Sequence, residues 1–158
     1  MLKRMTKLWL LVPPVVLLVA IVAACASNEP GQESATEAPS AAIGQRVETE
    51  DGSYINVTPE ELRSMLDSKD FPLVNVHIPY EGEIEGTDLF IPYNQIAGRL
   101  DELPPEKDAK IVVYCRSGRM SAVAAETLVS HGYTNVWNLD GGMIAWEEVG
   151  YPLLNAGG

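Results

Sequence analysis

The hydrophobic positions of this chain fall into two alternating patterns. Short apolar runs rich in β-branched residues are typical of buried strands, and they lie at 54–57, 73–77, 111–114 and 135–139. The segments between them carry helix-start signals or apolar residues at helical spacing. Helices are predicted at 58–68, 94–102 and 121–131, with a short helix after Gly141-Gly142. Strands that alternate with helices predict one α/β domain, with a mostly parallel central sheet covered by helices on both faces.

Local signals mark where several of these elements begin and end. Thr58, with proline next and Glu61 three positions on, is typical of a capping box at a helix start. Asn94 is expected to cap the helix at 94–102. Gly132 is expected to stop the helix at 121–131, where His131 makes a C-terminal cap interaction.

The N-terminus has the pattern of a targeting segment. A positively charged start precedes the uninterrupted apolar stretch 8–24, as in secretory signal peptides. The stretch ends in Val-Ala-Ala-Cys at 22–25, which resembles the lipobox of bacterial lipoproteins. The resemblance implies that residues 1–24 are removed and that Cys25 carries the lipid. The basic residues of the start are Lys3, Arg4 and Lys7.

An uncleaved transmembrane anchor is the alternative. The apolar stretch is short for a full span, and Pro13-Pro14 inside it would break a membrane-spanning helix. Either interpretation places the rest of the chain outside the cytoplasm, attached to a membrane in the periplasm or at the cell surface. Residues 25–44 are small, polar and rich in Pro and Gly, which predicts a disordered tether. The domain is then expected to occupy residues 45–158.

The charge of the chain limits its partners. The sequence holds 11 basic and 22 acidic residues; without residues 1–24 it keeps 8 basic and 22 acidic ones, a formal charge of −14. Nucleic acids and anionic membrane surfaces are poor partners for such a body. No metal-ligand or cofactor motif is found, so neither a metal nor a cofactor is expected.

The cysteine count directs attention to one thiol. The chain has two cysteines, and if Cys25 is lipidated then Cys115 has no partner for an intrachain disulfide. An exported protein that keeps a free thiol in an oxidising compartment is expected to use it for reactivity or intermolecular exchange. A buried, inert cysteine is the alternative.

Cys115 follows the predicted strand 111–114 directly and precedes the predicted helix 121–131. Unpaired backbone N–H groups and the helix dipole concentrate positive potential at such a position. Arg116 and Arg119 add two charges. This setting stabilises a thiolate, and ligands of parallel sheets bind at the carboxyl ends of the strands. Cys115 is therefore the candidate nucleophile.

Four segments together resemble the rhodanese family. They are Val-Val-Tyr-Cys-Arg-Ser-Gly-Arg-Met-Ser at 112–121, Leu-Val-Asn-Val-His at 73–77, Gly-Tyr-Thr-Asn-Val at 132–136 and Leu-Asp-Gly-Gly-Met-Ile-Ala-Trp at 139–146. The resemblance covers about residues 54–153 and implies a rhodanese-like fold with sulfurtransferase activity. It implies that Cys115 takes sulfane sulfur from thiosulfate or a similar donor as a persulfide, which a thiol or cyanide then removes. The implied substrate-binding residues are Arg116, Ser117, Gly118, Arg119, Met120 and Ser121.

The chain departs from the family pattern beside the active loop. Many members have Asp-Val-Arg where this chain has Asn75-Val-His77, and many have arginine at the sixth loop position, which is Met120 here. His77, with Asn75, is a candidate for tuning Cys115 because histidine titrates near neutral pH. A structural histidine whose hydrogen bonds are satisfied is the alternative. Gly118 is expected to relieve the backbone of the loop rather than to contact substrate.

An acidic segment at 79–92 replaces the more familiar family pattern. It is expected to be a solvated loop at the rim of the site; a Ca²⁺ site is the alternative, although the ligand spacing of a known calcium loop is absent. Tyr80, Phe90 and Tyr93 are candidates for the mouth of the site, with packing as the alternative.

Two other functions compete with catalytic sulfur transfer. A cysteine phosphatase or arsenate reductase needs arginine six positions after the cysteine to clamp an oxyanion, and this chain has Ser121 there. A membrane-tethered sulfur carrier or persulfide sensor would use the same Cys115 chemistry without turnover. The expected partners are small sulfur-containing anions or thiols, the membrane through the lipid anchor, and a protein acceptor in the carrier interpretation.

Overall fold

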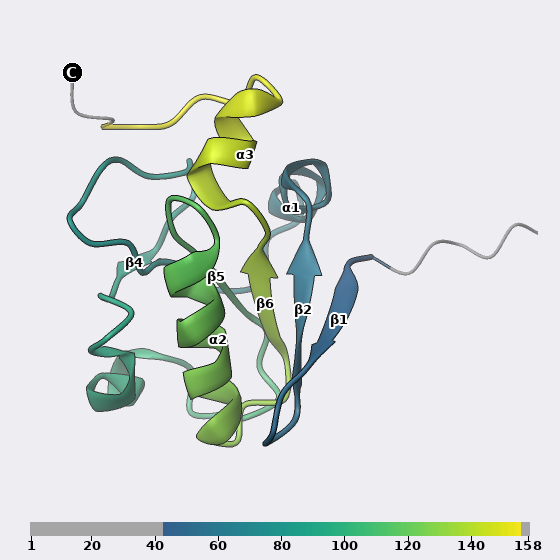
Figure 1. Ribbon diagram of the computed structural model, residues 1–158, viewed down its shortest axis with the longest axis vertical. Helices are drawn as coiled ribbons and strands as arrows, with labels where there is room; N and C mark the ends of the chain where they lie inside the picture. Colours follow the sequence, from purple (N-terminus) through teal and green to yellow (C-terminus); the bar gives the residue numbers. More distant parts are fainter. Residues whose placement is uncertain (1–42, 156–158) are drawn as a thin grey trace, which may run out of the picture. The chain divides into compact units, whose positions relative to one another are not determined.

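The computed structural model describes residues 43–155, which form a sheet with helices on both sides (Figure 1). The strands lie in the order β1-β2-β6-β5-β3-β4; only β1 and β2 pair antiparallel, and every other neighbouring pair is parallel. Their bounds are β1 Gln45–Glu48, β2 Ser53–Val57, β3 Leu73–Asn75, β4 Leu89–Phe90, β5 Ile111–Tyr114 and β6 Val136–Leu139. The predicted mostly parallel α/β sheet is confirmed.

The helices are α1 Pro59–Leu66, α2 Arg119–Ser130 and α3 Gly142–Glu148, with short 3-10 helices η1 Ile96–Gly98 and η2 Leu100–Glu102. The capping box of α1 is present, with Thr58 and Glu61 exchanging hydrogen bonds. His131 ends α2 as expected, and its Nδ1 lies 2.7 Å from the Thr127 carbonyl oxygen. Among residues 43–155 no helix is long and apolar enough to cross a membrane.

The single helix predicted at 94–102 is wrong. The chain forms η1 and η2 instead, and Arg99 between them has φ −129° and ψ 29°, outside the helical region. Asn94 is not the cap, since Gln95 precedes η1 without a side-chain hydrogen bond to its backbone. A short segment that lacks a capping side chain and contains Gly98 has too little local stability to hold a longer helix.

The strand predicted at 73–77 is shorter, and two strands were missed. β3 ends at Asn75, and the His77 N–H donates to the Asn75 side-chain oxygen at 3.0 Å instead of to a neighbouring strand. β1 gives a weak signal because most of its residues are exposed, and β4 spans only two residues. Gly44, expected in the tether, already belongs to the domain, because its N–H donates to Glu61 Oε1 at 3.0 Å.

The two faces of the sheet pack against different helices. Alternate residues of β5 point to opposite sides: Ile111, Val113 and Cys115 join the core that includes α2, whereas Val112 and Tyr114 join the core that includes α1 and α3. Cys115 thus lies at the carboxyl end of a central strand, on the α2 face. The segment 1–24, Cys25 and the tether up to residue 42 lie outside the described residues, as do 156–158.

Candidate active site

The loop that carries Cys115 begins where β5 ends and closes at the first residue of α2. Gly118 is the N-cap of α2 and has φ +83°, a left-handed conformation that favours glycine. This confirms the expected backbone role of Gly118. α2 starts at Arg119, two residues earlier than predicted, so Arg119 and Met120 extend from the first helical turn.

The N-terminus of α3 contacts the loop from the face of the sheet opposite to α2. The Met143 N–H donates to the Cys115 carbonyl oxygen, and the Ile144 N–H donates to the Arg116 carbonyl oxygen, both at 2.9 Å. Gly142, with φ +60°, packs so closely that a methyl group there would overlap the backbone of Cys115 and Arg116. The Gly-Gly dipeptide of the 139–146 motif is therefore a support for the active loop.

The Cys115 sulfur is enclosed and accepts a hydrogen bond from a serine hydroxyl. Cys115 is a free cysteine and only 1% exposed. The Ser121 hydroxyl donates to Sγ at 3.4 Å, with the Gly118 carbonyl oxygen as its other acceptor at 3.1 Å. Within residues 43–155, none of the backbone N–H groups of 116–121 donates to another protein group. These donors at the N-terminus of α2 can stabilise a thiolate or a persulfide anion.

A cavity of about 330 Å³ opens beside the sulfur. Arg119, Met120 and Ser117, three of the residues expected to bind substrate, line it. Its other lining residues are Cys115, His77, Tyr93 and Val123. Of the three aromatic candidates only Tyr93 reaches the cavity; Tyr80 and Phe90 contact each other edge to face, with ring centroids 5.6 Å apart. Sequence reasoning missed Val123 because it is one of many apolar positions on α2.

Arg116 lies outside this cavity, which its assignment to substrate binding did not anticipate. Its Nε lies 3.0 Å from Glu81 Oε2, and its Nη1 lies 3.9 Å from Glu147 Oε2. The two arginines of the loop therefore differ, since Arg119 lines the cavity and Arg116 is paired with carboxylates. The difference could not be predicted because it depends on Glu81, which is distant in sequence.

Asn75 and His77 stand beside the active loop but act differently. Asn75 is fully buried and holds the chain that follows it, accepting from the His77 N–H and donating from Nδ2 to the Gly82 carbonyl oxygen at 2.9 Å. His77 lines the cavity, and its Nε2 lies 3.4 Å from Glu81 Oε2. Neither ring nitrogen makes a hydrogen bond within residues 43–155. Tuning of Cys115 by His77 stays a prediction.

The acidic segment 79–92 exposes Glu81, Glu85 and Asp88 to solvent, as expected, but other parts of it are attached to the domain. Asp88 accepts from the Leu73 N–H at 2.7 Å and pairs with Lys69. Ile84 is fully buried, and its N–H donates to the Tyr114 hydroxyl at 3.1 Å. Burial raises the pKa of Tyr114 to about 12, so the phenol stays neutral. No cluster of residues suited to a metal ion is found within 43–155, so the Ca²⁺ alternative gains no support.

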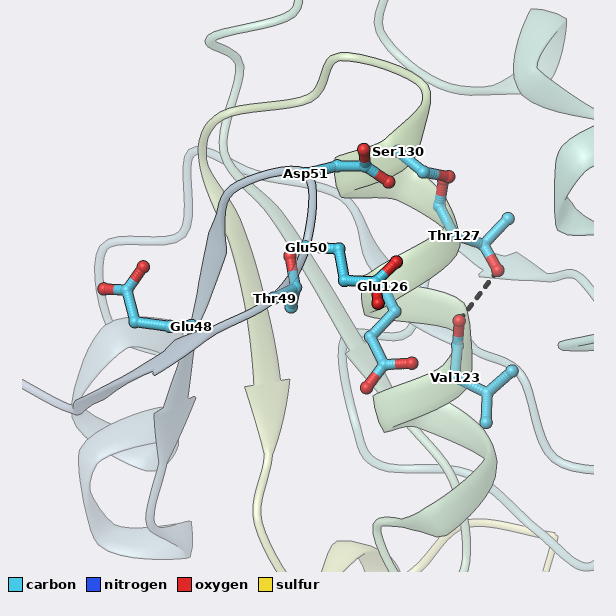
Figure 2. A pocket seen from close by; sticks show the side chains of 8 residues that line it. All are labelled: Glu48, Thr49, Glu50, Asp51, Val123, Glu126, Thr127 and Ser130. Carbon is cyan, nitrogen blue, oxygen red and sulfur yellow. Dashed lines mark hydrogen bonds between the residues drawn. The ribbon is translucent and has the colours of Figure 1, made fainter.

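A second hollow, of about 720 Å³, lies between the β1–β2 turn and α2 (Figure 2). Glu48, Glu50, Asp51 and Glu126 surround it, and the Thr127 hydroxyl donates to the Val123 carbonyl oxygen at 2.8 Å beside it. Neither cysteine nor histidine lines it, and its titratable side chains are the four carboxylates. The candidate chemistry of the domain is therefore concentrated at Cys115.

A cysteine on an anion-binding loop at the carboxyl edge of a parallel sheet defines a class of α/β domains that react through a thiolate. The rhodanese-like domain family matches residues 58–149. This chain belongs to the rhodanese-like family.

Individual relatives agree with this assignment. A sulfurtransferase of Allochromatium vinosum is 39% identical over 93 residues, covering 57% of this chain and 84% of that protein. A probable adenylyltransferase/sulfurtransferase of Mycobacterium tuberculosis is 36% identical over 102 residues, covering 61% of this chain but 25% of the relative. A tRNA uridine(34) hydroxylase of Erwinia tasmaniensis is 32% identical over 112 residues, covering 65% of this chain and 31% of that enzyme.

Solved structures share the fold. A rhodanese-like domain protein from Staphylococcus aureus superposes with a TM-score of 0.53 at 29% identity, covering 65% of this chain and 98% of that one. A rhodanese-related protein from Thermoplasma volcanium gives a TM-score of 0.53 at 28% identity, with 63% and 96% covered. The family and its sulfurtransferase members support sulfur transfer as the general activity of this chain.

Proposed function

We propose that the protein is a sulfurtransferase that moves sulfane sulfur from thiosulfate or a similar donor to a thiol or cyanide, through a persulfide on Cys115. The observation that carries this proposal is the position of Cys115 Sγ, which lies at a cavity and accepts from Ser121 at 3.4 Å beside free backbone N–H groups. A single nucleophilic thiol is sufficient because the covalent intermediate is a persulfide and not a disulfide.

The reaction divides into two balanced displacements. The Cys115 thiolate attacks the outer sulfur of thiosulfate; the S–S bond of thiosulfate breaks, and sulfite leaves with the electron pair, so that Cys115 carries S–S⁻. An acceptor thiolate then attacks the outer sulfur of this persulfide and leaves as R–S–S⁻, which restores the Cys115 thiolate. The N–H groups of 116–120 stabilise the anionic sulfur in both steps, by the logic of an oxyanion hole.

The proposal includes a location. Cleavage after residue 24 and lipidation of Cys25 would hold the domain outside the cytoplasm, on a tether of about 20 residues whose average reach is about 25 Å. The motif Val-Ala-Ala-Cys at 22–25 supports this part of the proposal. Radiolabelled palmitate should label the expressed chain but not its Cys25→Ser variant; equal labelling of the two would contradict the lipoprotein proposal.

A non-turnover sulfur carrier or persulfide sensor is the second candidate. Cys115 is only 1% exposed, and this burial favours a carrier whose protein partner opens access to the sulfur. The number of sulfite equivalents released per Cys115 distinguishes an enzyme from a carrier. The full-length chain, mixed with thiosulfate and excess cyanide or a low-molecular-weight thiol, should release many equivalents of sulfite per Cys115 if it is an enzyme. Release of one equivalent, followed by no more, would support the carrier.

A further inference from the structure

β1 forms an open edge of the sheet (Figure 1). It pairs with β2 on one side, and no segment within residues 43–155 pairs with its other side. An edge strand presents unpaired N–H and carbonyl groups that can accept a further strand, and many edges are protected by a proline or a bulge. β1 has the sequence Gln-Arg-Val-Glu and pairs with β2 residue by residue, so it has neither protection.

The register shows which backbone groups of β1 point away from the sheet. In an antiparallel pair, residues that exchange hydrogen bonds with the neighbouring strand alternate with residues whose N–H and carbonyl groups face the other way. The Thr49 N–H donates to the Gly52 carbonyl oxygen at 2.8 Å, so Thr49 faces β2 and so does Val47, two positions earlier. Arg46 and Glu48 therefore hold the outward-facing N–H and carbonyl groups of the edge.

β2 gives the same alternation independently. The Val57 carbonyl oxygen accepts from the Asp140 N–H at 2.9 Å, so Val57 faces β6. Tyr54, an odd number of positions earlier, must face the opposite neighbour, β1, where its partner is Val47. The assignment of the outward groups to Arg46 and Glu48 thus has two separate supports.

A second copy of β1 complements this edge in antiparallel register. Hydrogen-bonded pairs across the edge must join outward-facing residues of both copies. When Val47 lies opposite Val47 of the second copy, each Arg46 lies opposite a Glu48, and opposite charges on facing residues stabilise a sheet. The registers two positions away place Arg46 opposite Arg46 or Glu48 opposite Glu48, and these like charges disfavour them.

The two charged side chains are available for this contact. Both residues are exposed, and neither forms an ion pair within residues 43–155. Arg46 donates from Nη1 to the Ser53 hydroxyl of β2. Its other guanidinium N–H groups remain as donors for a carboxylate, since arginine carries several in a fixed plane.

We propose that β1 docks antiparallel on β1 of a second copy of this chain, about a two-fold axis at Val47 that joins the two sheets into one. Such an isologous contact is closed, because each copy uses the same residues. Its small size gives a weak dimer. β2 and β6 separate β1 from β5, which carries Cys115 at its end, so the inference is independent of sulfur transfer.

Two cysteine variants test the register, each in a chain with Cys25→Ser and Cys115→Ser. In Val47→Cys the two thiols lie opposite each other on the axis, with Cα atoms about 4.5 Å apart, which a disulfide spans. Gln45→Cys is the matched control, because its two copies lie about 13 Å apart along the paired strands. Under mild oxidation of the full-length chain, Val47→Cys should form disulfide dimers at least about tenfold faster than Gln45→Cys.

The control is also the more exposed position, so random collision would favour Gln45→Cys. Equal rates, or faster cross-linking of Gln45→Cys, would overturn the proposed register. The result does not depend on thiosulfate or on the thiol of Cys115, and failure of the proposed sulfur transfer would leave it unchanged.

Charge exchange tests the same pairing without a new cysteine. Arg46→Glu and Glu48→Arg each place like charges opposite each other twice, and each should lower the association constant of the full-length chain about tenfold. The double variant Arg46→Glu/Glu48→Arg restores both opposite-charge pairs and should restore the association. Sedimentation equilibrium under reducing conditions in one detergent measures all four proteins.

The two single variants change the net charge in opposite directions, so a general effect of charge repulsion would strengthen one and weaken the other. The segment 8–24 is the same in every variant, and association through it would not respond to these changes. A natural chain that stays monomeric, an association that the single variants leave unchanged, or a loss that the double variant does not restore would overturn the proposal.

Discussion

Ser121 occupies the sixth position after Cys115, and its hydroxyl has two acceptors for one proton. These are Cys115 Sγ at 3.4 Å and the Gly118 carbonyl oxygen at 3.1 Å. The side chain is fully buried, so no solvent replaces either contact. A thiolate is a stronger acceptor than a neutral thiol, and the hydroxyl is therefore expected to favour Sγ when Cys115 ionises.

Replacing Ser121 should test this contact with little change in volume. In Ser121→Ala, the rate of iodoacetamide alkylation at Cys115 near neutral pH should fall roughly five- to tenfold, as expected for one hydrogen bond to an anion. Ser130→Ala removes a serine of the same helix whose hydroxyl donates to the Thr127 carbonyl oxygen and should leave the rate unchanged. Equal rates in Ser121→Ala and the natural chain would show that the hydroxyl does not stabilise the thiolate.

For single residues, the sequence predicts the positions that are set by the local backbone conformation. Cys115, Gly118 and Arg119 lie where a strand-to-helix loop places them. The environment of Arg116 was not predictable, because Arg116 pairs with Glu81, which lies in a segment whose sequence indicates neither helix nor strand. The same holds for His77, whose hydrogen bonding cannot be inferred without the loop that packs around it.

The backbones of α3 and the active loop approach each other closely. Two N–H groups of α3 donate to the carbonyl oxygens of Cys115 and Arg116, and Gly142 leaves no room for a side chain. The helix and the loop therefore form one unit, in which α3 fixes the carbonyl side of the loop and leaves its N–H groups free.

Gly142→Ala should lower the free energy of unfolding by about 3 kcal/mol or more, because it adds a backbone overlap to a strained positive φ. Gly132→Ala is the matched control: Gly132 has φ +87° and open space around its Cα, so only the strain of a left-handed conformation, about 1–2 kcal/mol, should appear. Urea unfolding measures both values. Similar losses in the two variants would argue against tight packing of α3 on the loop.

Tyr114 of β5 connects the sheet to the segment 79–92. Its hydroxyl accepts from the Ile84 N–H and lies 2.7 Å from the Thr87 hydroxyl. Burial raises its pKa to about 12, whereas a tyrosine in an unfolded chain titrates near 10. The unfolded chain therefore loses this proton first, and the stability that Tyr114 contributes is complete below about pH 10 and decreases as the pH rises to 12.

Tyr114→Phe should change how stability depends on pH. At pH 7 the variant should be less stable by about 1–3 kcal/mol, because the buried Ile84 N–H loses its acceptor. The difference from the natural chain should shrink by about 2 kcal/mol between pH 10 and 12. Urea unfolding as a function of pH measures it, with Tyr151→Phe as the control. A difference that stays constant over this range would contradict the account.

The elements that the sequence predicts are those with strong local signals. β5 matches its predicted bounds, and α1 begins at its predicted capping box. β1 is not predictable in this way, because it is an exposed edge strand defined by its pairing with β2. The segment 94–102 shows the reverse case: a helix was predicted there, but the chain forms only short 3-10 helices.

Over the whole molecule, a strong negative charge contrasts with an arginine at the cavity. The full chain has a formal charge of −11, whereas Arg119 lines the cavity of Cys115. In the proposed reaction, an anionic donor is held by groups at the site and not by the general field of the protein. The sequence predicts the overall charge, and the structure adds which arginine of the loop lines the cavity.

The central claim is that Cys115 carries a persulfide, and the mass of the protein tests it most directly. The full-length chain, reduced and then mixed with thiosulfate or polysulfide, should gain the mass of one sulfur atom on the peptide that contains Cys115. Cys115→Ser should gain none, and added thiol should remove the sulfur again. Absence of this adduct with every sulfane donor, in a chain whose Cys115 still reacts with iodoacetamide, would contradict the account.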